Sequence, residues 1–168
     1  MKKIASFTIL AVIVLPLIVF PAGASGAPAR EGGTTFNEAE GKDWFLSELK
    51  SAGKTINIDR KTFEADNMAG FFSVSFRKDK ASNENRMGGM GAPNRYFGPY
   101  SAGSNRTLRI GNIASTMMMA FKEPDELKEH EYFSYLNKVT RWDIREGKLE
   151  LYSLNSDGTE AALIFISN

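Results

Sequence analysis

The chain of 168 residues contains no cysteine and a single histidine, His130. Without cysteine there can be no disulfide, no thiolate metal site and no cysteine nucleophile. Zinc sites that need two or three histidines are likewise excluded within one chain. The composition therefore removes disulfide-stabilised proteins, cysteine-dependent enzymes and zinc sites built on cysteines or on two or three histidines before any motif is considered.

Long hydrophobic runs are scarce as well, because only one occurs and it lies at the start of the chain. Residues 4–20 are almost wholly apolar, follow the basic start MKK and precede small residues. This order is typical of a secretory signal, and we predict cleavage after Ala24. The alternatives are cleavage after Gly26 or Ala29 and retention of the run as an anchor. We expect an exported protein, periplasmic or extracellular, with no stable membrane span after cleavage; without a cysteine after the run, a lipid-anchored lipoprotein is excluded.

A strong charge of either sign is also absent. Cleavage removes Lys2 and Lys3, which leaves 19 of the 21 basic residues against 20 acidic ones, a net charge of −1. Such a balance favours neither nucleic acid nor an anionic membrane as a partner. We predict a signal peptide over residues 1–24, a flexible linker over 25–41, which is polar and rich in turn formers, and one domain over 42–168.

Alternation of apolar and polar residues predicts half-buried strands in the segments TINID, FFSVSF and TLRIGNI. A helix is expected from Asp125 to Val139, after Pro124 and with an apolar stripe at helical spacing. Gly147 and Gly158 then predict two tight hairpins between RWDI, KLELYSL and AALIFI. The predicted fold class is α+β: mostly antiparallel β, a curled sheet or partial barrel packed around one main α-helix.

The stretch GMGAPNRYFGPY, residues 89–100, is the most distinctive motif. It lacks the lysine and the Ser/Thr of a phosphate-binding loop, and no helix follows it, so the dinucleotide fingerprint also fails. A Gly-x-Ser-x-Gly nucleophile motif is missing too. We interpret the stretch as structural, with glycines and Asn94 supplying backbone angles that are closed to most residues.

Three segments in order, GAPNRYFGPY, IASTMMMAF and EYFSYLNKVTRWDIREGKLELYS, resemble the signatures of the META domain, the family of the bacterial heat-shock protein HslJ. There a Gly-Cys-Asn-x-Tyr-x-Gly loop precedes a Thr-x-Met-Ala-Cys segment and a helix of the Glu-x-x-Phe-x-x-Leu kind. The resemblance runs from Trp44 to the C-terminus. It implies a small, mostly β domain around one helix, common in exported proteins, linked to stress tolerance or virulence, and without an established enzymatic activity. Matching residues, all interpreted as fold determinants, are Gly91, Asn94, Tyr96, Gly98, Thr116 and Met118.

The two cysteines of the family pattern fall at Pro93 and at or next to Ala120, and both are missing. Their joint loss leaves no reactive thiol and disfavours a redox function. If these positions pair in relatives, the two segments should lie side by side here and bring Met90 close to residues 117–119.

Methionines cluster around the same two segments. Thioethers suit Cu(I), so a copper site is one interpretation, with candidate ligands Met87, Met90, Met117 and Met119. The interpretation we favour is that these side chains fill irregular gaps in the core. We also expect the acidic stretch EPDELKEHE, which starts at Glu123, to be an ordinary solvated face.

These observations predict a non-catalytic envelope protein that has no cofactor and binds an envelope or host protein. The alternative is a carrier of an apolar or lipid ligand inside the curled sheet, which would need an apolar cavity of about 300 Å³ or more. An enzyme is the least favoured class, because the chain offers no recognisable set of nucleophile, base and metal ligands.

Overall fold

The computed structural model describes residues 35–119 and 124–167. The predicted signal peptide and the start of the predicted linker lie outside these residues. The elements in chain order are a 3-10 helix η1 (Phe36–Glu38), β1 (Asp43–Ser51), β2 (Lys54–Asn57), α1 (Arg60–Ala65), β3 (Ser73–Lys78), β4 (Asn85–Met90), β5 (Arg95–Ala102), β6 (Leu108–Ile110), β7 (Ala114–Ser115), α2 (Glu129–Asn137), β8 (Val139–Arg145), β9 (Lys148–Leu154) and β10 (Glu160–Ser167).

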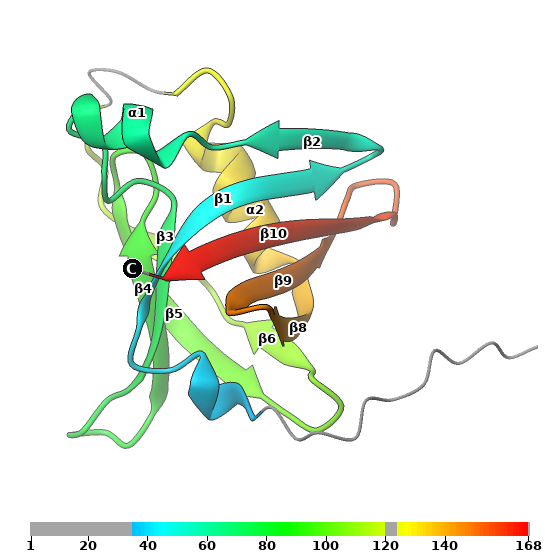
Figure 1. Cartoon of the computed structure of the whole chain (residues 1–168). Coiled ribbons are helices and arrows are strands. Elements are labelled where there is room, and N and C mark those ends of the chain that lie inside the picture. Colours follow the sequence, from blue (N-terminus) through cyan, green and yellow to red (C-terminus); the bar gives the residue numbers. More distant parts are fainter. Residues whose placement is uncertain (1–34, 120–123, 168) are drawn as a thin grey trace, which may run out of the picture. The chain divides into compact units, whose positions relative to one another are not determined.

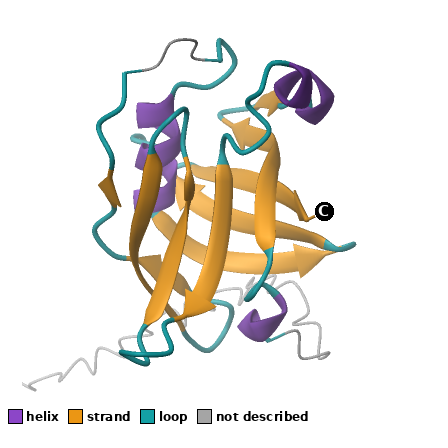
Figure 2. Ribbon diagram, turned by 90° about the vertical axis from the view of Figure 1, so that its left-hand side faces the viewer, coloured by secondary structure: helices purple, strands orange, loops and turns teal. Residues whose placement is uncertain are grey.

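The described strands form one curled sheet in the order β6-β5-β4-β3-β1-β10-β9-β8, with β2 added beside β1 and β7 beside β5. Each of these strand pairs is antiparallel. Figure 1 shows the sheet curling until β6 comes close to β8, and Figure 2 shows α2 packed against the sheet. The predicted α+β class, with a curled antiparallel sheet around one main helix, is confirmed.

The predicted hairpin turns are confirmed, since Gly147 and Gly158 both have positive φ, 74° and 82°. The predicted helix is shorter than expected. It begins at Glu129, because Lys128 keeps an extended backbone and its N–H donates to the Glu131 carboxylate at 2.9 Å. At the other end Val139 already belongs to β8.

A short helix that the sequence analysis missed, α1, follows β2. Asp59 is its N-cap: the carboxylate accepts from the Lys61 N–H at 3.1 Å and from the Thr62 hydroxyl at 2.8 Å. Only Phe63 of this helix is buried. One buried position in six residues produces no helical stripe, which is why periodicity could not reveal the helix.

Aromatic rings fill the interior of the sheet. Phe36 packs against Phe76, Tyr100 and Trp142, with ring centroids 5.0, 5.4 and 5.1 Å apart. Phe36 lies within the stretch predicted to be a linker, so the ordered core extends further toward the N-terminus than the first apolar cluster suggested. A lone aromatic in a polar stretch gave no periodic signal for this packing.

The two ends of the strand order are connected where Arg106, just before β6, contacts β8. The main-chain N–H of Trp142 donates to the main-chain carbonyl of Arg106 at 2.9 Å. Asp143, only 3% exposed, accepts from the Arg106 guanidinium, from Arg145 Nε at 2.7 Å and from the Ile144 N–H at 2.8 Å. A buried carboxylate with two cationic partners therefore joins the two ends of the strand order.

Replacing Asp143 should test this connection. Asp143→Ala leaves the partly buried Arg106 without its carboxylate, and we expect unfolding in urea to become easier by about 2–3 kcal/mol, below the usual cost of breaking a fully buried pair. Glu160→Ala, which breaks the exposed pair with Arg141, is the control and should cost less than about 1 kcal/mol. Equal losses for the two variants would contradict a closing role for Asp143.

Candidate functional site

The distinctive glycine-rich stretch is mostly strand and contains one tight turn. β4 ends at Met90 and β5 begins at Arg95, so residues 91–94 alone form the connection. The Gly91 N–H closes it by donating to the Asn94 carbonyl at 2.7 Å. The motif is therefore the tip of a β-hairpin whose two strands carry its remaining residues.

Close contacts, and not backbone angles, explain the glycines of this hairpin. Contrary to expectation, neither the glycines nor Asn94 has a positive φ. A Cβ added at Gly89 would lie 2.0 Å from the Ser73 carbonyl oxygen, and one at Gly91 would lie 2.4 Å from Glu129 Oε1. Glycine is required because other atoms occupy the space of a side chain.

The carboxylate of Glu129, the first residue of α2, binds the turn. Oε1 accepts from the Ala92 N–H at 2.6 Å and from the Asn94 N–H at 2.7 Å, while Oε2 accepts from Asn94 Nδ2 at 2.6 Å. We call this arrangement the Glu129 clamp. It attaches the helix to the hairpin tip through three charge-assisted hydrogen bonds, the stronger kind in proteins.

Asn94 extends the clamp to a third segment, which runs beside β5. Its side chain is buried, with Oδ1 accepting from the Met118 N–H at 2.6 Å and from the Thr116 hydroxyl at 2.9 Å. Asn94 Nδ2 also lies 3.3 Å from the Met118 carbonyl oxygen. Thr116 Oγ1 in turn accepts from the Arg95 N–H at 3.1 Å. One amide therefore holds the turn, the helix and residues 116–118 together.

Two tyrosines share one carbonyl beneath the clamp. The hydroxyls of Tyr96 and Tyr132 donate to the Ser73 carbonyl oxygen at 2.7 and 3.1 Å and lie 3.1 Å from each other. Burial raises the pKa of both phenols above the ordinary value near 10. Neither ring is accessible to a ligand, because Tyr96 is 2% exposed and Tyr132 is fully buried.

The structure gathers most of the predicted motif residues at one place. Gly91, Asn94, Thr116 and Met118 meet around the clamp, and Tyr96 lies two positions further along β5 from Asn94. Gly98 stands apart, against the carbonyl of Asn112, where an added Cβ would come within 3.0 Å.

Sequence reasoning missed Glu129, Tyr132 as a hydrogen-bonding partner, and Ser73. The acidic stretch before and within α2 was expected to be solvated, and Asp125 and Glu126 are indeed exposed. Glu129 differs because it is the helix's first residue and faces the turn's N–H groups. Its position at the helix start was the one available signal, and the four-residue error in the predicted boundary concealed it.

The two segments that carry cysteines in the family pattern do lie side by side. Ser115 pairs with Tyr96, and Met118 is bonded to the side chain of Asn94, next to Pro93. The expected juxtaposition is therefore confirmed as far as Met118. Ala120 itself lies outside the described residues, and the expected proximity of Met90 to residues 117–119 stays a prediction.

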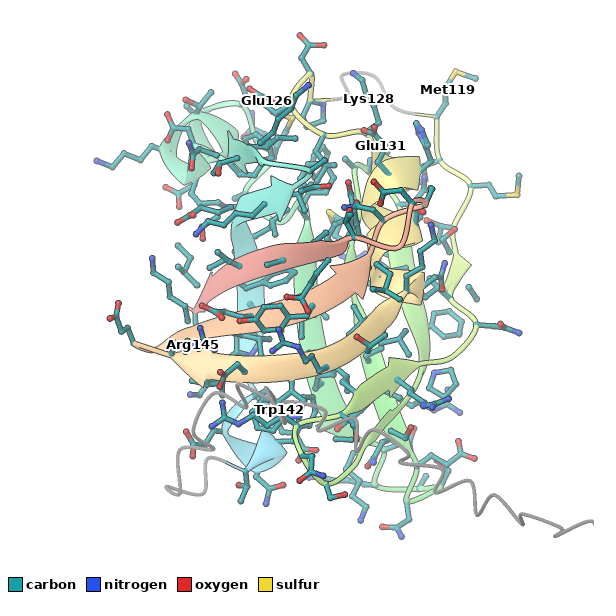
Figure 3. All side chains as sticks on the ribbon, turned by 90° about the vertical axis from the view of Figure 1, so that its right-hand side faces the viewer. Met119, Glu126, Lys128, Glu131, Trp142 and Arg145 are labelled. Carbon is teal, nitrogen blue, oxygen red and sulfur yellow. The ribbon has the colours of Figure 1, made fainter. Side chains whose placement is uncertain are left out.

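An exposed extended segment, residues 114–119, is the most unusual surface feature of the described chain. All six residues are exposed in succession, and Met117, Met118 and Met119 reach 98%, 59% and 95% exposure. Phe97, which pairs with Ala114 across the β5–β7 ladder, is 57% exposed. We call these six residues and Phe97 the methionine edge. Figure 3 shows the Met119 side chain directed away from the protein.

The methionines do not behave as a group. Met87 fills the core as expected, at 1% exposure. The prediction that the methionines pack in the core is wrong for Met117, Met118 and Met119, which are exposed. Met87 pairs with Gly98, four residues along β5 from Asn94, a separation of about 13 Å in a strand. The four candidate copper ligands are therefore not brought together. Among the described residues no group of three or more His, Asp or Glu could hold a metal ion either.

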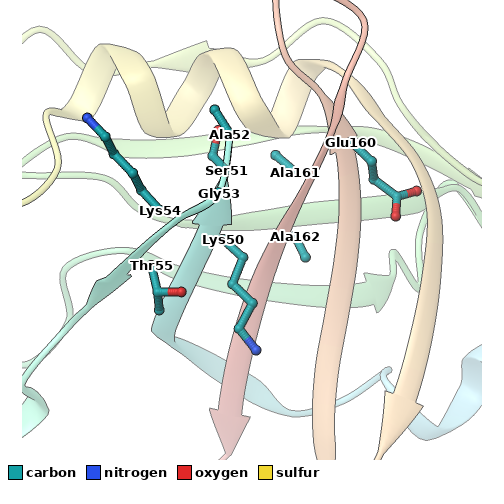
Figure 4. A pocket seen from close by; sticks show the side chains of 9 residues that line it. All are labelled: Lys50, Ser51, Ala52, Gly53, Lys54, Thr55, Glu160, Ala161 and Ala162. Carbon is teal, nitrogen blue, oxygen red and sulfur yellow. The ribbon is translucent and has the colours of Figure 1, made fainter.

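Two surface pockets border the sheet. One, of about 360 Å³, is lined by residues of the β1–β2 hairpin tip and the start of β10: Lys50, Ser51, Ala52, Gly53, Lys54, Thr55, Glu160, Ala161 and Ala162 (Figure 4). The other, of about 600 Å³, lies outside β4 and β5, beside Phe97, and is lined by Lys78, Asn83, Glu84, Asn85, Arg86, Phe97, Gly98, Pro99, Tyr100, Asn112 and Ala114. Charged side chains are prominent in both linings, and the second lining adds the amides of Asn83, Asn85 and Asn112.

Gly91 offers a direct test of the clamp. Gly91→Ala places a methyl group where Glu129 and Phe133 now lie, so the carboxylate must move away from the turn. We expect a cost of about 1–3 kcal/mol and a melting temperature lower by several degrees. Gly70→Ala is the matched control, because its Cβ would meet only the end of the flexible Met90 side chain, at 3.4 Å from Sδ and 3.8 Å from Cε. A melting temperature unchanged by Gly91→Ala would argue against a tightly held clamp.

The buried tyrosines predict sensitivity to alkali. Since the pKa of Tyr96 and of Tyr132 is raised in the folded protein, the unfolded chain ionises first as the pH passes about 10. The stability that neutral tyrosines provide should be fully present below pH 10 and lost progressively above it. Thermal melts across pH 8–11 should show this fall, and Tyr132→Phe should make it shallower. An equally steep fall in the variant would exclude Tyr132 as a cause.

Comparisons with solved structures show that other proteins have a similar fold. The chain is similar to a protein from Burkholderia xenovorans solved by NMR, with 18% identity, a TM-score of 0.59, and coverage of 90% of this chain and 99% of that one. A DUF4847 family protein from Bacteroides vulgatus, solved by crystallography, has 14% identity and a TM-score of 0.49, over 79% of this chain and 96% of that one. At such identities the first likeness shows the fold alone. A search of curated proteins found no match.

The family comparison is more specific. Residues 37–165 match the META domain, a span that includes the hairpin tip, the Thr116–Met118 segment, α2 and the C-terminal strands. The three signatures recognised in the sequence are the three segments that the Glu129 clamp and the paired strands bring together. The chain belongs to the META domain family.

Proposed function

We propose that this META-domain chain is a non-catalytic protein of the cell envelope that binds another protein, in support of stress tolerance or host interaction. The observation that carries the proposal is the methionine edge. Monomeric soluble proteins seldom expose a contiguous large apolar surface unless something binds there. Here Met117, Met118 and Met119 are exposed in succession within six consecutive exposed residues, and Phe97 on the neighbouring strand is exposed as well.

Methionine suits this role chemically. Its side chain is unbranched and polarizable, so it adapts to differently shaped partners, and methionine is over-used on surfaces that bind several targets. The segment's backbone is held in place by Asn94 and Thr116, while the side chains of Met117 and Met119 remain almost fully exposed. A fixed backbone that carries adaptable side chains supports recognition of a protein surface.

The packing disfavours the alternative of an apolar carrier. Phe36 contacts Phe76, Tyr100 and Trp142 inside the curled sheet, and Tyr132 contacts Phe72 at 5.2 Å between ring centroids. An apolar ligand would have to displace these rings. We therefore place binding on the outside of the domain.

The chemistry of the clamp favours a structural role over catalysis. Both oxygens of Glu129 accept hydrogen bonds from the turn, and the two tyrosine hydroxyls donate to a main-chain carbonyl below the surface. Each of these groups has a role in holding elements together. A non-catalytic assignment follows as the simplest one.

Export is proposed from residues 1–24, which have the order of a secretory signal and lie outside the described residues. Within residues 35–119 and 124–167, every helix is too short or too polar to cross a membrane. The proposed location, periplasmic or extracellular, would give the methionine edge access to envelope or host proteins.

Photo-crosslinking in the cells that naturally make the protein tests the proposal. Benzoylphenylalanine at Met119 or at Phe97 should yield an adduct of defined mass on irradiation, identifiable by mass spectrometry. The same group at Lys61, exposed on α1, is the control and should give none. If position 61 is crosslinked as efficiently as 97 and 119, or none of the three gives an adduct, the methionine edge is not a binding surface.

A further inference from the structure

The backbone of the methionine edge, and not only its side chains, is arranged for binding. The Thr116 N–H donates to the Arg95 carbonyl at 2.9 Å, and the Met118 N–H donates to the Asn94 side chain at 2.6 Å. In an extended strand successive peptide groups point to opposite sides. The N–H and C=O groups of Ser115 and Met117 therefore point away from β5, and no described strand pairs with them.

We propose, on the basis of the proposed function, that the partner binds as an extended strand added to this edge. The β5–β7 ladder and the inward hydrogen bonds of the Thr116 and Met118 N–H groups leave four main-chain groups of Ser115 and Met117 directed outward, two donors and two acceptors. Strand addition obtains its affinity from such main-chain hydrogen bonds and its specificity from alternate side chains. Exposed, unpaired edges are the usual templates for it.

The side chains on the two faces of the edge define the chemistry of the added strand. Alternation puts Met117 and Met119 on one face. Thr116 lies on the other face, opposite Arg95: its N–H donates to the Arg95 carbonyl, and its hydroxyl accepts from the Arg95 N–H. The partner strand thus meets an apolar face at the methionines and a cationic face at Arg95.

Arg95 supplies the charge that selects the partner. It is exposed and forms no ion pair with any carboxylate among the described residues. An added strand would lie two strand spacings from β5, about 10 Å, which an arginine and a glutamate side chain can span together. The short side chain of Thr116 between them leaves the path open. The partner is therefore an extended segment that alternates apolar and acidic residues.

A second copy of this chain meets these requirements less well. Residues 114–119, ASTMMM, contain no acidic residue, so a copy pairing edge to edge would bring no carboxylate to Arg95. Pairing between copies is retained as an outcome of the test.

Hydrogen exchange by NMR on the uniformly labelled protein, with its predicted signal removed, tests strand addition. The probes are the capped heptapeptides Glu-Val-Glu-Val-Glu-Val-Glu and Lys-Val-Lys-Val-Lys-Val-Lys. In the free protein the amides of Thr116 and Met118 should exchange slowly and those of Ser115 and Met117 quickly. Saturation with the acidic peptide should slow the latter two by about tenfold or more. Unchanged exchange of these two amides at saturation would overturn the proposal.

Substitutions separate backbone from side-chain binding. Met117→Pro removes an outward N–H and should abolish binding of the acidic peptide, while Met117→Ala keeps the N–H and should weaken it only a few-fold. If the Met117→Ala variant binds the acidic peptide more weakly than the Met117→Pro variant does, side-chain contacts and not strand addition hold the peptide. The Arg95→Glu variant should prefer the lysine peptide to the acidic peptide. If it still prefers the acidic peptide, Arg95 does not select the partner.

The outcomes distinguish this inference from the proposed function. Photo-crosslinks at Phe97 and Met119 that persist in Met117→Pro would leave protein binding standing and exclude strand addition. Protection of Ser115 and Met117 that rises with protein concentration in the absence of peptide would identify a second copy as the occupant and overturn the acidic partner.

Discussion

The Glu129 carboxylate is the interaction on which the arrangement around the signature motif depends. It lies at the first turn of α2, where the helix dipole favours a negative charge, and it accepts three hydrogen bonds from the hairpin tip. A carboxylate binding main-chain N–H groups in a partly buried position is costly to remove, because those donors would lose their partner. The close approach leaves no room at Gly91 for any side chain.

This constraint reaches the surface through Asn94. The amide is oriented by Glu129 on its Nδ2 side, which directs Oδ1 toward Met118 and Thr116. The exposed segment is thereby held at a defined position beside β5 although its side chains have little packing. A motif that appears to concern a tight turn therefore also determines where the exposed strand edge is presented.

The interior of the sheet is packed with aromatic rings, whereas the methionine edge is exposed. Rings from η1, β3, β5, β8 and α2 fill the inside of the curled sheet, and an antiparallel ladder connects the strands. Asp143 on β8 joins the ends of the strand order through Arg106, which lies just before β6. With the interior packed, the packing of the described residues leaves the exposure of the methionine edge unexplained, and the proposed recognition of a partner would account for it.

The sequence by itself determined the strands with clear alternation, the hairpins at Gly147 and Gly158, the main helix to within four residues, and the family. These are local signals, carried by period-two patterns, turn residues and motif order. Only the tertiary structure revealed α1, the burial of Phe36, the Glu129 clamp and the exposure of residues 117–119. Their environments are set by residues distant in the chain: Glu129 by a turn 35 residues earlier, and the methionines by an edge left unpaired. Apolar composition alone could not show that such a run faces outward, because exposure depends on which strands find neighbours.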